Sequence, residues 1–191
     1  MASGKLIVIA APSGCGKTTI AKAILKKYPA MLFSVSATTR PVRNGELNGK
    51  DYFFLTKAEF EGRIRIGDLV EWEEIYDNYY GTLKSEISRA LQQGRIMLFD
   101  VDVKGALSIR RHFPNDSILV FVKPPSLEAL KQRLENRKTE NLETIKRRLE
   151  RVPMEMEQGQ QFDFQVVNDD LQKAISEVDE IVQANIKNII Y

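Results

Sequence analysis

The sequence predicts an α/β fold in which a central parallel sheet is covered by helices on both faces. Short apolar segments ended by turn residues alternate with longer amphipathic segments, and parallel strands need such crossover helices. The alternation is interrupted once, at residues 36–82, where glycine, asparagine, arginine and aromatic residues are interspersed. A chain of 191 residues suits one domain, so we expect this segment to be an insertion within it.

Each element follows from apolar patterning and from the residues that end it. Residues 6–9 are a short apolar run before a turn, which is typical of a buried strand. Residues 17–27 have apolar side chains on one face and basic residues at the carboxyl end, which is typical of a helix. We expect further strands at 33–35, 96–100, 117–122 and 164–167. Further helices are expected at 83–92, 103–112, 142–157 and 171–187, and one more begins after Ser126, which would be its N-cap. Within the insertion we expect strands at 51–55 and 69–75 around a helix at 57–66.

Composition and charge exclude several classes of protein. The net charge is only +2, which gives no electrostatic case for binding nucleic acid. One cysteine, Cys15, excludes an intramolecular disulfide and fits a reducing cytoplasm, and the single His112 excludes a histidine-based metal site. No apolar segment approaches the ~18 residues of a membrane span. We therefore expect a cytoplasmic protein that binds neither nucleic acid nor membranes.

The turn between the first expected strand and helix carries the most specific motif. It reads Ala11-Pro12-Ser13-Gly14-Cys15-Gly16-Lys17-Thr18. In this context the motif predicts a P-loop, whose backbone N–H groups and helix N-terminus hold nucleotide phosphates. Lys17 would contact the β/γ oxygens, and Thr18 would offer a hydroxyl to Mg²⁺. Ala11 replaces the usual first glycine, which an extended backbone accommodates. We interpret Cys15 as a small loop residue, not a nucleophile, in a loop where its side chain can point outward.

A second group of residues in the insertion suits a monophosphate. Arg40 and Arg43 are three residues apart, and tyrosines follow them in the segment. Arginine offers a planar fork of donors to phosphate oxygens, and a tyrosine hydroxyl adds one more. Trp72 is more typical of core packing than of ligand binding, and we interpret Tyr79 as strand packing.

With these motifs the chain resembles the guanylate kinase family over essentially its whole length. The resemblance implies an enzyme that transfers the γ-phosphoryl group of Mg-ATP to GMP or dGMP, in the cytoplasm, as a monomer or homodimer with Mg²⁺ as cofactor. It also implies a three-layer P-loop kinase fold. The expected parts are a core at 1–35, 83–130 and 157–191, an inserted mixed α/β GMP-binding region at 36–82, and a helical lid at 131–156.

The same resemblance assigns roles in acceptor binding. The GMP phosphate would be held by Ser36, Arg40, Arg43, Tyr52 and Tyr80, and the guanine would be read by Glu71 and Thr82. A carboxylate can accept hydrogen bonds from both N1–H and the N2 amino group of guanine. Adenine has no N1–H and would leave the carboxylate unpaired, so Glu71 would reject it. The family commonly has glycine where this chain has Asp77, a difference that concerns the geometry of the turn.

Two carboxylates, Asp100 and Asp102, come at the end of the expected strand 96–100, the edge at which α/β sheets bind ligands. Asp100 resembles the Walker-B acid, which organises Mg²⁺ through water. In the family both residues lie beside the guanine and the metal. The alternative is that both cap the following helix.

The expected lid is rich in basic residues, and for most of them a solvated helix face is the simpler interpretation. By resemblance, Arg133, Arg137 and Arg148 would close over the phosphates, and Arg137 and Arg148 would be catalytic together with Lys17 and Arg40. Asn168 would offer an amide to the adenine of ATP, while a helix N-cap is an equally plausible role for Asp170.

Three other functions are compatible with parts of this pattern. A phosphopeptide-binding scaffold domain does not need Lys17 and Thr18, which are intact. A kinase for another nucleoside monophosphate does not need Glu71 beside the arginine pair. A regulatory GTPase needs a base-reading Asn-Lys-x-Asp run, which the sequence lacks.

Overall fold

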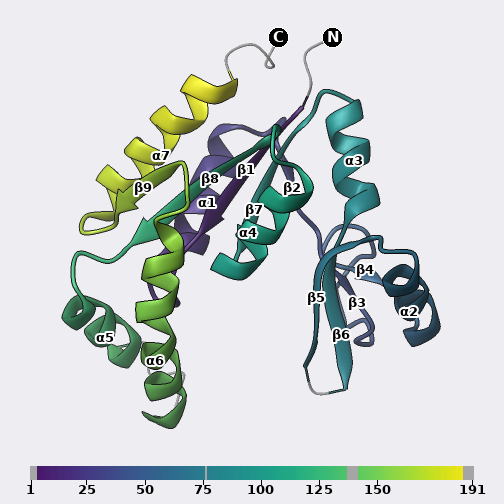
Figure 1. Cartoon of the computed structure of the whole chain (residues 1–191), viewed down its shortest axis with the longest axis horizontal. Helices are drawn as coiled ribbons and strands as arrows, with labels where there is room; N and C mark the ends of the chain where they lie inside the picture. The colour runs from purple at the N-terminus through teal and green to yellow at the C-terminus, as the bar shows by residue number, and fades with distance from the viewer. Residues whose placement is uncertain (1–3, 76, 137–141, 187–191) are drawn as a thin grey trace.

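The structure is a computed structural model that describes residues 4–75, 77–136 and 142–186. Within these residues, nine strands form two sheets and seven helices pack on or beside them (Figure 1). The larger sheet has the order β2-β7-β1-β8-β9, and its strands are all parallel. These strands are β1 (Lys5–Ala10), β2 (Leu32–Phe33), β7 (Ile96–Val101), β8 (Ser117–Lys123) and β9 (Phe164–Val167).

Helices cover both faces of this sheet. Successive residues of β1 alternate between two apolar cores: Ile7 and Ile9 belong to one, Leu6 and Val8 to the other. The first core includes residues of α1 (Lys17–Lys27) and α7 (Leu171–Ile186), the second residues of α3 (Lys84–Gln92) and α4 (Val103–His112). The α/β class with a central parallel sheet is therefore confirmed.

A smaller mixed sheet is built from the segment that interrupts the alternation. Its order is β4-β3-β6-β5. The strands are β3 (Ala37–Thr38), β4 (Phe53–Phe54), β5 (Leu69–Ile75) and β6 (Asn78–Leu83). Helix α2 (Lys57–Arg65) packs on this sheet through the wholly buried Phe60. The helix begins with a capping box, in which Thr56 and Glu59 each accept the other's backbone N–H.

The hairpin of β5 and β6 contains the turn with Asp77, where the resemblance described above leads us to expect glycine. Ile75 pairs with Asn78, and Asp77 between them has a φ of 61°. This left-handed conformation favours glycine, and Asp tolerates it better than most other residues. Asp77 therefore adopts the conformation for which glycine is the usual choice. Strands β3 and β6 were not predicted from the sequence: β3 consists of two residues that pair with distant segments, and β6 pairs both with its hairpin neighbour β5 and with the distant β3.

Two helices extend from the larger sheet on the side opposite the smaller one (Figure 1). They are α5 (Leu127–Asn136) and α6 (Leu142–Gly159). The predicted N-cap of α5 is confirmed, since the Ser126 hydroxyl accepts the Ala129 N–H at 3.1 Å. Helix α6 ends against the sheet at Gly159, where a Cβ would lie 2.4 Å from the ring of Phe121. Among the described residues, no helix has both the length and the apolar character needed to cross a membrane.

Candidate functional site

The loop between β1 and α1 turns at two glycines. Gly14 and Gly16 have φ values of 95° and 83°, which side-chain-bearing residues rarely adopt. Ala11 has no such requirement, because Asp77 is the one non-glycine residue with positive φ in the described part of the chain. A Cβ on Gly16 would also lie 2.5 Å from the Asn168 amide nitrogen. Backbone conformation and a close neighbour thus both require glycine at position 16.

The side-chain amide of Asn168 donates a hydrogen bond to the backbone of this loop. Asn168 follows β9, is 4% exposed, and donates from Nδ2 to the carbonyl of Cys15 at 2.8 Å. Arg133 of α5 in turn donates to the carbonyls of Asn168 and Asp169, at 2.8 and 3.3 Å. Asp170 caps α7, since its Oδ1 accepts the Lys173 N–H at 2.8 Å. In this structure Asn168 and Arg133 therefore contact the loop and its supporting segment.

The prediction that the Cys15 side chain points outward is wrong. The side chain is fully buried and belongs to the first apolar core, together with Leu130 and Leu134 of α5. The left-handed glycines on either side turn the backbone so that this side chain faces inward. The expectation for Trp72 is also wrong: this side chain is 45% exposed and meets the ring of Tyr79 edge-on at 5.7 Å. The packing role predicted for Tyr79 is confirmed, because it also lies 5.3 Å from the ring of Phe60.

Cationic side chains surround the loop. Lys17 Nζ forms an ion pair with Oδ1 of Asp100, and Arg148 donates from Nη1 to the hydroxyl of Ser13. Thr18, the first-turn residue after Lys17, is exposed. The loop opens into a cavity of about 450 Å³, lined by residues 11–19 together with Asp102, Arg148, Arg151 and Glu155. Arg137 lies outside the described residues.

Arg151 and Glu155 line this cavity and were not among the residues predicted from the sequence. Arg151 lies 3.8 Å from a carboxylate oxygen of Asp102 and 3.7 Å from one of Glu155. Burial raises the pKa of Glu155 above its ordinary value, against the opposing effect of Arg151. The spacing of Arg148, Arg151 and Glu155 places them on one face of a helix, a signal that could have identified them.

The two aspartates occupy different structural positions. Asp100 is inside β7 and not beyond it, and its side chain meets Lys17. Asp102 is the N-cap of α4, where its Oδ1 accepts the Gly105 N–H at 2.8 Å. The capping alternative therefore describes Asp102 but not Asp100.

A second cavity of about 630 Å³ lies between β5 and α4. Glu71 lines it, and the Thr82 hydroxyl on the neighbouring strand donates to Oε1 of Glu71 at 2.7 Å. Burial raises the pKa of Glu71, partly offset by this hydrogen bond. Asp102 lines both this cavity and the loop cavity. The two halves of the candidate site therefore meet at Asp102.

The guanidinium of Arg40 is held in one orientation. Its side chain is 11% exposed and its Cζ lies 5.2 Å from the ring centre of Tyr52. Nη1 donates to the Pro41 carbonyl at 2.7 Å and to Oε2 of Glu46 at 3.0 Å, while Nη2 donates to Oε1 of Glu46 at 2.7 Å. Since a guanidinium has five N–H groups, one on Nη2 and one on Nε remain without a partner among the described residues. These two lie on the same edge and form a fork suited to two oxygens of a phosphate.

Glu46 connects the remaining residues of this cluster. It also accepts the backbone N–H of Arg43 at 2.7 Å, while the Arg43 side chain is exposed. The Arg40 hydrogen bond, followed by the Arg43 backbone, holds the pKa of Glu46 below its ordinary value. Tyr80 meets the ring of Tyr52 edge-on at 6.3 Å. Glu46 was not among the predicted site residues, because its contact with Arg40 depends on how the loop folds.

Ser36 lies immediately before β3. Its carbonyl accepts the Phe53 N–H at 2.9 Å, at the start of the β3–β4 pairing.

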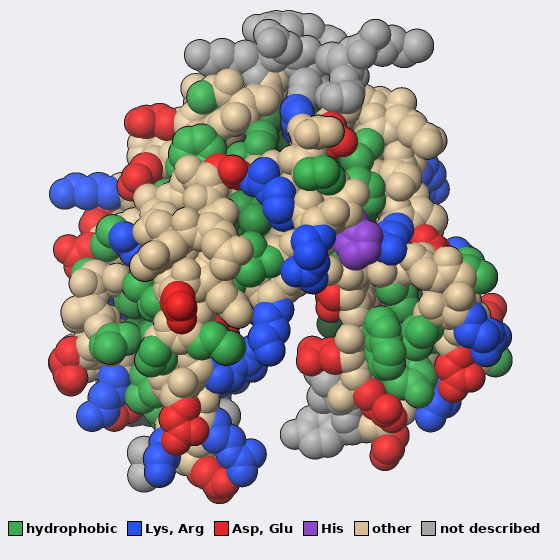
Figure 2. All heavy atoms as spheres, in the orientation of Figure 1, with side chains coloured by type: hydrophobic (Ala, Val, Ile, Leu, Met, Phe, Trp, Pro, Cys, Tyr) green, Lys and Arg blue, Asp and Glu red, His purple; other side chains and the backbone are tan. Residues whose placement is uncertain are grey.

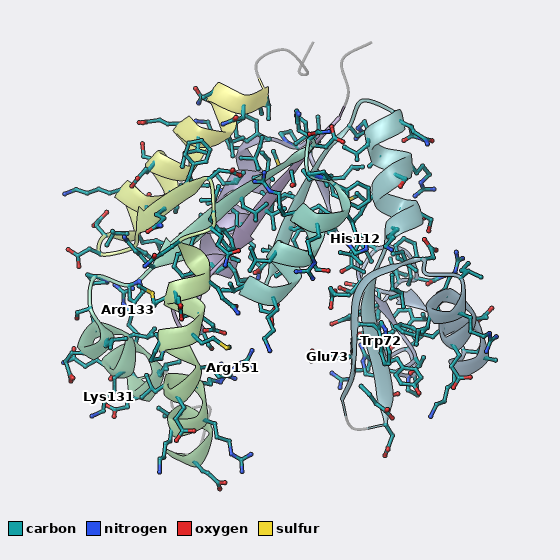
Figure 3. The ribbon with its side chains drawn as sticks, viewed as in Figure 1. Trp72, Glu73, His112, Lys131, Arg133 and Arg151 are labelled. Atoms are coloured by element: carbon teal, nitrogen blue, oxygen red, sulfur yellow. The ribbon has the colours of Figure 1, made fainter. Side chains whose placement is uncertain are left out.

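Figure 2 shows a deep opening between the part of the molecule with α5 and α6 and the part with β5 and β6. In Figure 3, Arg151 and Glu73 lie on opposite sides of this opening, while Trp72 lies on the other side of β5.

The comparisons with known proteins identify the family. The family model described as Guanylate kinase matches residues 3–185. The chain belongs to the guanylate kinase family. It is 50% identical over 178 residues to a guanylate kinase of Salinibacter ruber, covering 93% of this chain and 94% of the relative. It is 48% identical over 175 residues to that of Chlorobium luteolum, covering 92% and 89%.

The fold agrees with this family. The crystal structure of guanylate kinase from Anaplasma phagocytophilum matches with a TM-score of 0.70 at 28% identity, covering 96% of this chain and 86% of the other. The resemblance that the P-loop and the acceptor motifs indicate in the sequence is thereby confirmed. A guanylate kinase is a nucleoside monophosphate kinase.

Proposed function

We propose that this guanylate kinase transfers the γ-phosphoryl group of Mg-ATP to GMP or dGMP in the cytoplasm, giving ADP and GDP, and that it acts as a monomer or homodimer. The observation that carries the proposal is the juxtaposition of two cavities at Asp102, one lined by a P-loop and the other by Glu71. The first would take the phosphates of ATP and the second the guanine of GMP.

In the donor half, residues 11–18 would bind ATP. The N–H groups at the start of α1 would bind the β-phosphate, and Lys17 would exchange Asp100 for the β/γ oxygens. Arg148 already reaches the loop at Ser13, so it would contact phosphate without leaving α6. Arg137 would join it, whereas Arg133 and Asn168 would act through the loop that they support.

The residues near the loop fit Mg²⁺. Magnesium prefers oxygen ligands and is commonly held by one or two protein groups with water and substrate phosphates. The hydroxyl of Thr18 and, through water, the carboxylate of Asp100 supply such groups. Among the described residues there is no group of three His, Cys, Asp or Glu side chains suited to a metal, so most ligands would come from ATP and water. When bound, Mg²⁺ neutralises charge on the β- and γ-phosphate oxygens.

In the acceptor half, Arg40 would bind the GMP phosphate through its Nε/Nη2 edge, assisted by Arg43, Ser36, Tyr52 and Tyr80. Glu71 would accept N1–H and the N2 amino group of guanine, with Thr82 holding its carboxylate in place. Asp102 would lie beside both nucleotides.

Transfer would be direct and in line. An oxygen of the GMP phosphate attacks the γ-phosphorus, and the bond from that phosphorus to the bridging oxygen of ADP breaks. The attacking phosphate is already an anion at neutral pH, so no general base is needed. The chain contributes positioning, charge neutralisation and exclusion of water.

Exclusion of water would require closure of the opening in Figure 2. We propose that the GMP-binding region, residues 36–82, and the lid, residues 131–156, move toward the core formed by 1–35, 83–130 and 157–191. Small-angle scattering with a bisubstrate analogue tests this. Compaction is expected, and an unchanged radius of gyration would contradict it.

The acceptor panel tests the function. Purified protein with Mg-ATP is assayed for ADP formation with GMP, dGMP, AMP, UMP and TMP, and only the first two are expected to react efficiently.

Glu71→Ala should lose most of the preference for GMP over AMP, by about tenfold or more, because a buried hydrogen bond to a charged group is removed. Glu74→Ala, on the same strand but exposed, is the matched control and should retain it. A Glu71→Ala enzyme with wild-type preference would show that another residue reads the base.

A further inference from the structure

Strand β5 contains an extra residue immediately before Glu71. Leu69 pairs with Leu83 on β6, and Glu71 pairs with Thr82. The pairing thus advances two residues along β5 but only one along β6. Val70 is the residue without a counterpart, which defines a β-bulge.

The bulge decides which face of the sheet carries Glu71. In a regular strand, residues two apart point to the same face. Leu69 and Leu83 both belong to the apolar cluster beneath α2, so a regular β5 would direct Glu71 into that cluster as well. Because of the extra residue, Glu71 lies beside Thr82, whose hydroxyl bonds it, on the opposite face. Bulges next to active sites commonly redirect a side chain in this way.

Val70 is fixed to the main core by both its side chain and its backbone. The side chain is 4% exposed and belongs to the second apolar core, with residues of α3 and α4, whereas its neighbour Leu69 belongs to the cluster beneath α2. Its carbonyl accepts a hydrogen bond from the hydroxyl of Ser108 at 2.7 Å. Ser108 is on α4 and is 5% exposed. A buried carbonyl without a partner is costly, so this hydroxyl stabilises the bulged conformation.

We propose that Ser108 is a positioning residue for acceptor recognition: its hydroxyl holds the Val70 bulge that turns the Glu71 carboxylate toward the acceptor. The inference rests on the proposed function, in which Glu71 reads the guanine. Ser108 also lines the second cavity, but its hydroxyl donates to the Val70 carbonyl, so it would act on the nucleotide through Glu71. This hydrogen bond joins α4, which packs on the larger sheet, to β5 of the smaller sheet. It therefore fixes the position of Glu71 relative to the P-loop.

The first test is Ser108→Ala, measured with GMP, IMP and ATP. IMP lacks the N2 amino group, so the GMP/IMP ratio reports the alignment of the Glu71 carboxylate. We expect KM for GMP to rise about tenfold, in line with the loss of one buried hydrogen bond, and the GMP/IMP ratio to fall. The KM for ATP should change by less than about twofold, because the P-loop does not contact Ser108. An unchanged KM for GMP would overturn the inference.

Ser117→Ala is a matched control. Ser117 is also 5% exposed, and its hydroxyl donates to a backbone carbonyl, that of Phe113, at 2.8 Å. It begins β8 and pairs with Leu6 near the amino end of β1, whereas the P-loop follows the carboxyl end of β1. We expect Ser117→Ala to lower the melting temperature about as much as Ser108→Ala does, with both KM values unchanged. If the two variants change KM for GMP equally, the effect reflects general destabilisation and the inference fails.

A double-mutant cycle with Glu71→Ala separates this inference from the proposed function. If Ser108 acts through Glu71, Ser108→Ala should have little further effect on KM for GMP in the Glu71→Ala background. If Glu71→Ala loses guanine selectivity but the Ser108→Ala effect persists in full, the inference alone is wrong. If Glu71→Ala keeps its selectivity, the proposed reading of guanine is wrong, and the inference falls with it. Ser108→Cys, which keeps the shape and a weaker donor, should give a smaller change in the same direction and serves if Ser108→Ala does not fold.

Discussion

The donor and acceptor halves of the site are built by different physical means. The P-loop presents backbone N–H groups and is fixed by left-handed glycines, by the buried Asn168 amide and by Arg133 behind it. The acceptor half presents side chains on short strands and loops, and Arg40 is oriented by one carboxylate, that of Glu46. The first is supported by the two large cores, the second by a small apolar cluster of four buried residues.

This difference separates tasks that the two substrates impose. Phosphates of ATP need a dense array of donors at fixed positions, which a backbone loop supplies without side-chain entropy. Recognition of one base needs a specific acceptor pattern, which only side chains provide. We therefore expect changes in the P-loop to alter catalysis and changes in the smaller sheet to alter acceptor affinity and selectivity.

Lys17→Ala should have the largest effect. Removing the ammonium takes away the charge that would contact the transferring phosphoryl group, and we expect kcat to fall by about 10³-fold. Binding of GMP, measured by calorimetry, should change little, since GMP would bind in the other half. Lys22→Ala, an exposed lysine on the same helix, is the control and should behave as wild type. A loss of GMP binding equal to the loss of kcat would contradict the separation of the two halves.

Arg40→Lys should produce the largest change in the acceptor half. A lysine cannot keep the two-oxygen contact with Glu46 and still offer a planar fork to phosphate. We expect KM for GMP to rise by about 10- to 100-fold, with KM for ATP nearly unchanged. Arg43→Lys should have a smaller effect, because the Arg43 side chain is exposed and its backbone makes the contact with Glu46. Equal effects of the two substitutions would show that the orientation of Arg40 does not matter.

The pH dependence of GMP binding should reveal the raised pKa of Glu71. Only the carboxylate can accept both guanine donors, and burial shifts its protonation to a higher pH than the ordinary value of 4.5. As the pH falls through this raised pKa, kcat/KM for GMP should fall several-fold, while kcat/KM for ATP lacks this step. The raised pKa also affects stability. Glu71 contributes to the free energy of unfolding fully at a pH below the pKa that it has in the unfolded chain, and this contribution is lost as the pH rises through its pKa in the folded protein. Glu71→Gln should therefore raise the melting temperature at neutral pH and remove the acid-side fall in kcat/KM for GMP.

Asp77→Gly should give the smallest effect. Glycine adopts a φ of 61° without the steric cost of a Cβ, so we expect a gain of about 0.5 kcal/mol in the free energy of unfolding, measured by urea denaturation. Asp77→Ala keeps the Cβ and should give no gain. Destabilisation by glycine would mean that the aspartate side chain contributes more than the backbone conformation costs.

Local patterns were sufficient for much of the fold. The bounds of α1, α4, β5 and β9 agree with the sequence prediction, because each depends on apolar periodicity and on its own end residues. The P-loop was found for the same reason, since its glycines and Lys17 are contiguous. Cys15 and Trp72 were misjudged, because the environment of one side chain depends on which distant element packs against it.

The sequence by itself determined the alternation of strands and helices and the phosphate loop, and its resemblance to a family supplied the residues proposed to read a guanine nucleotide. Tertiary structure decided how those residues are held: Glu46 against Arg40, Asn168 against Cys15, and Arg151 beside Asp102. It also decided the face on which Glu71 lies, because that depends on an extra residue in the pairing of two strands. Pairing register and contacts between distant residues arise only when the chain folds, and no local pattern in the sequence encodes them alone.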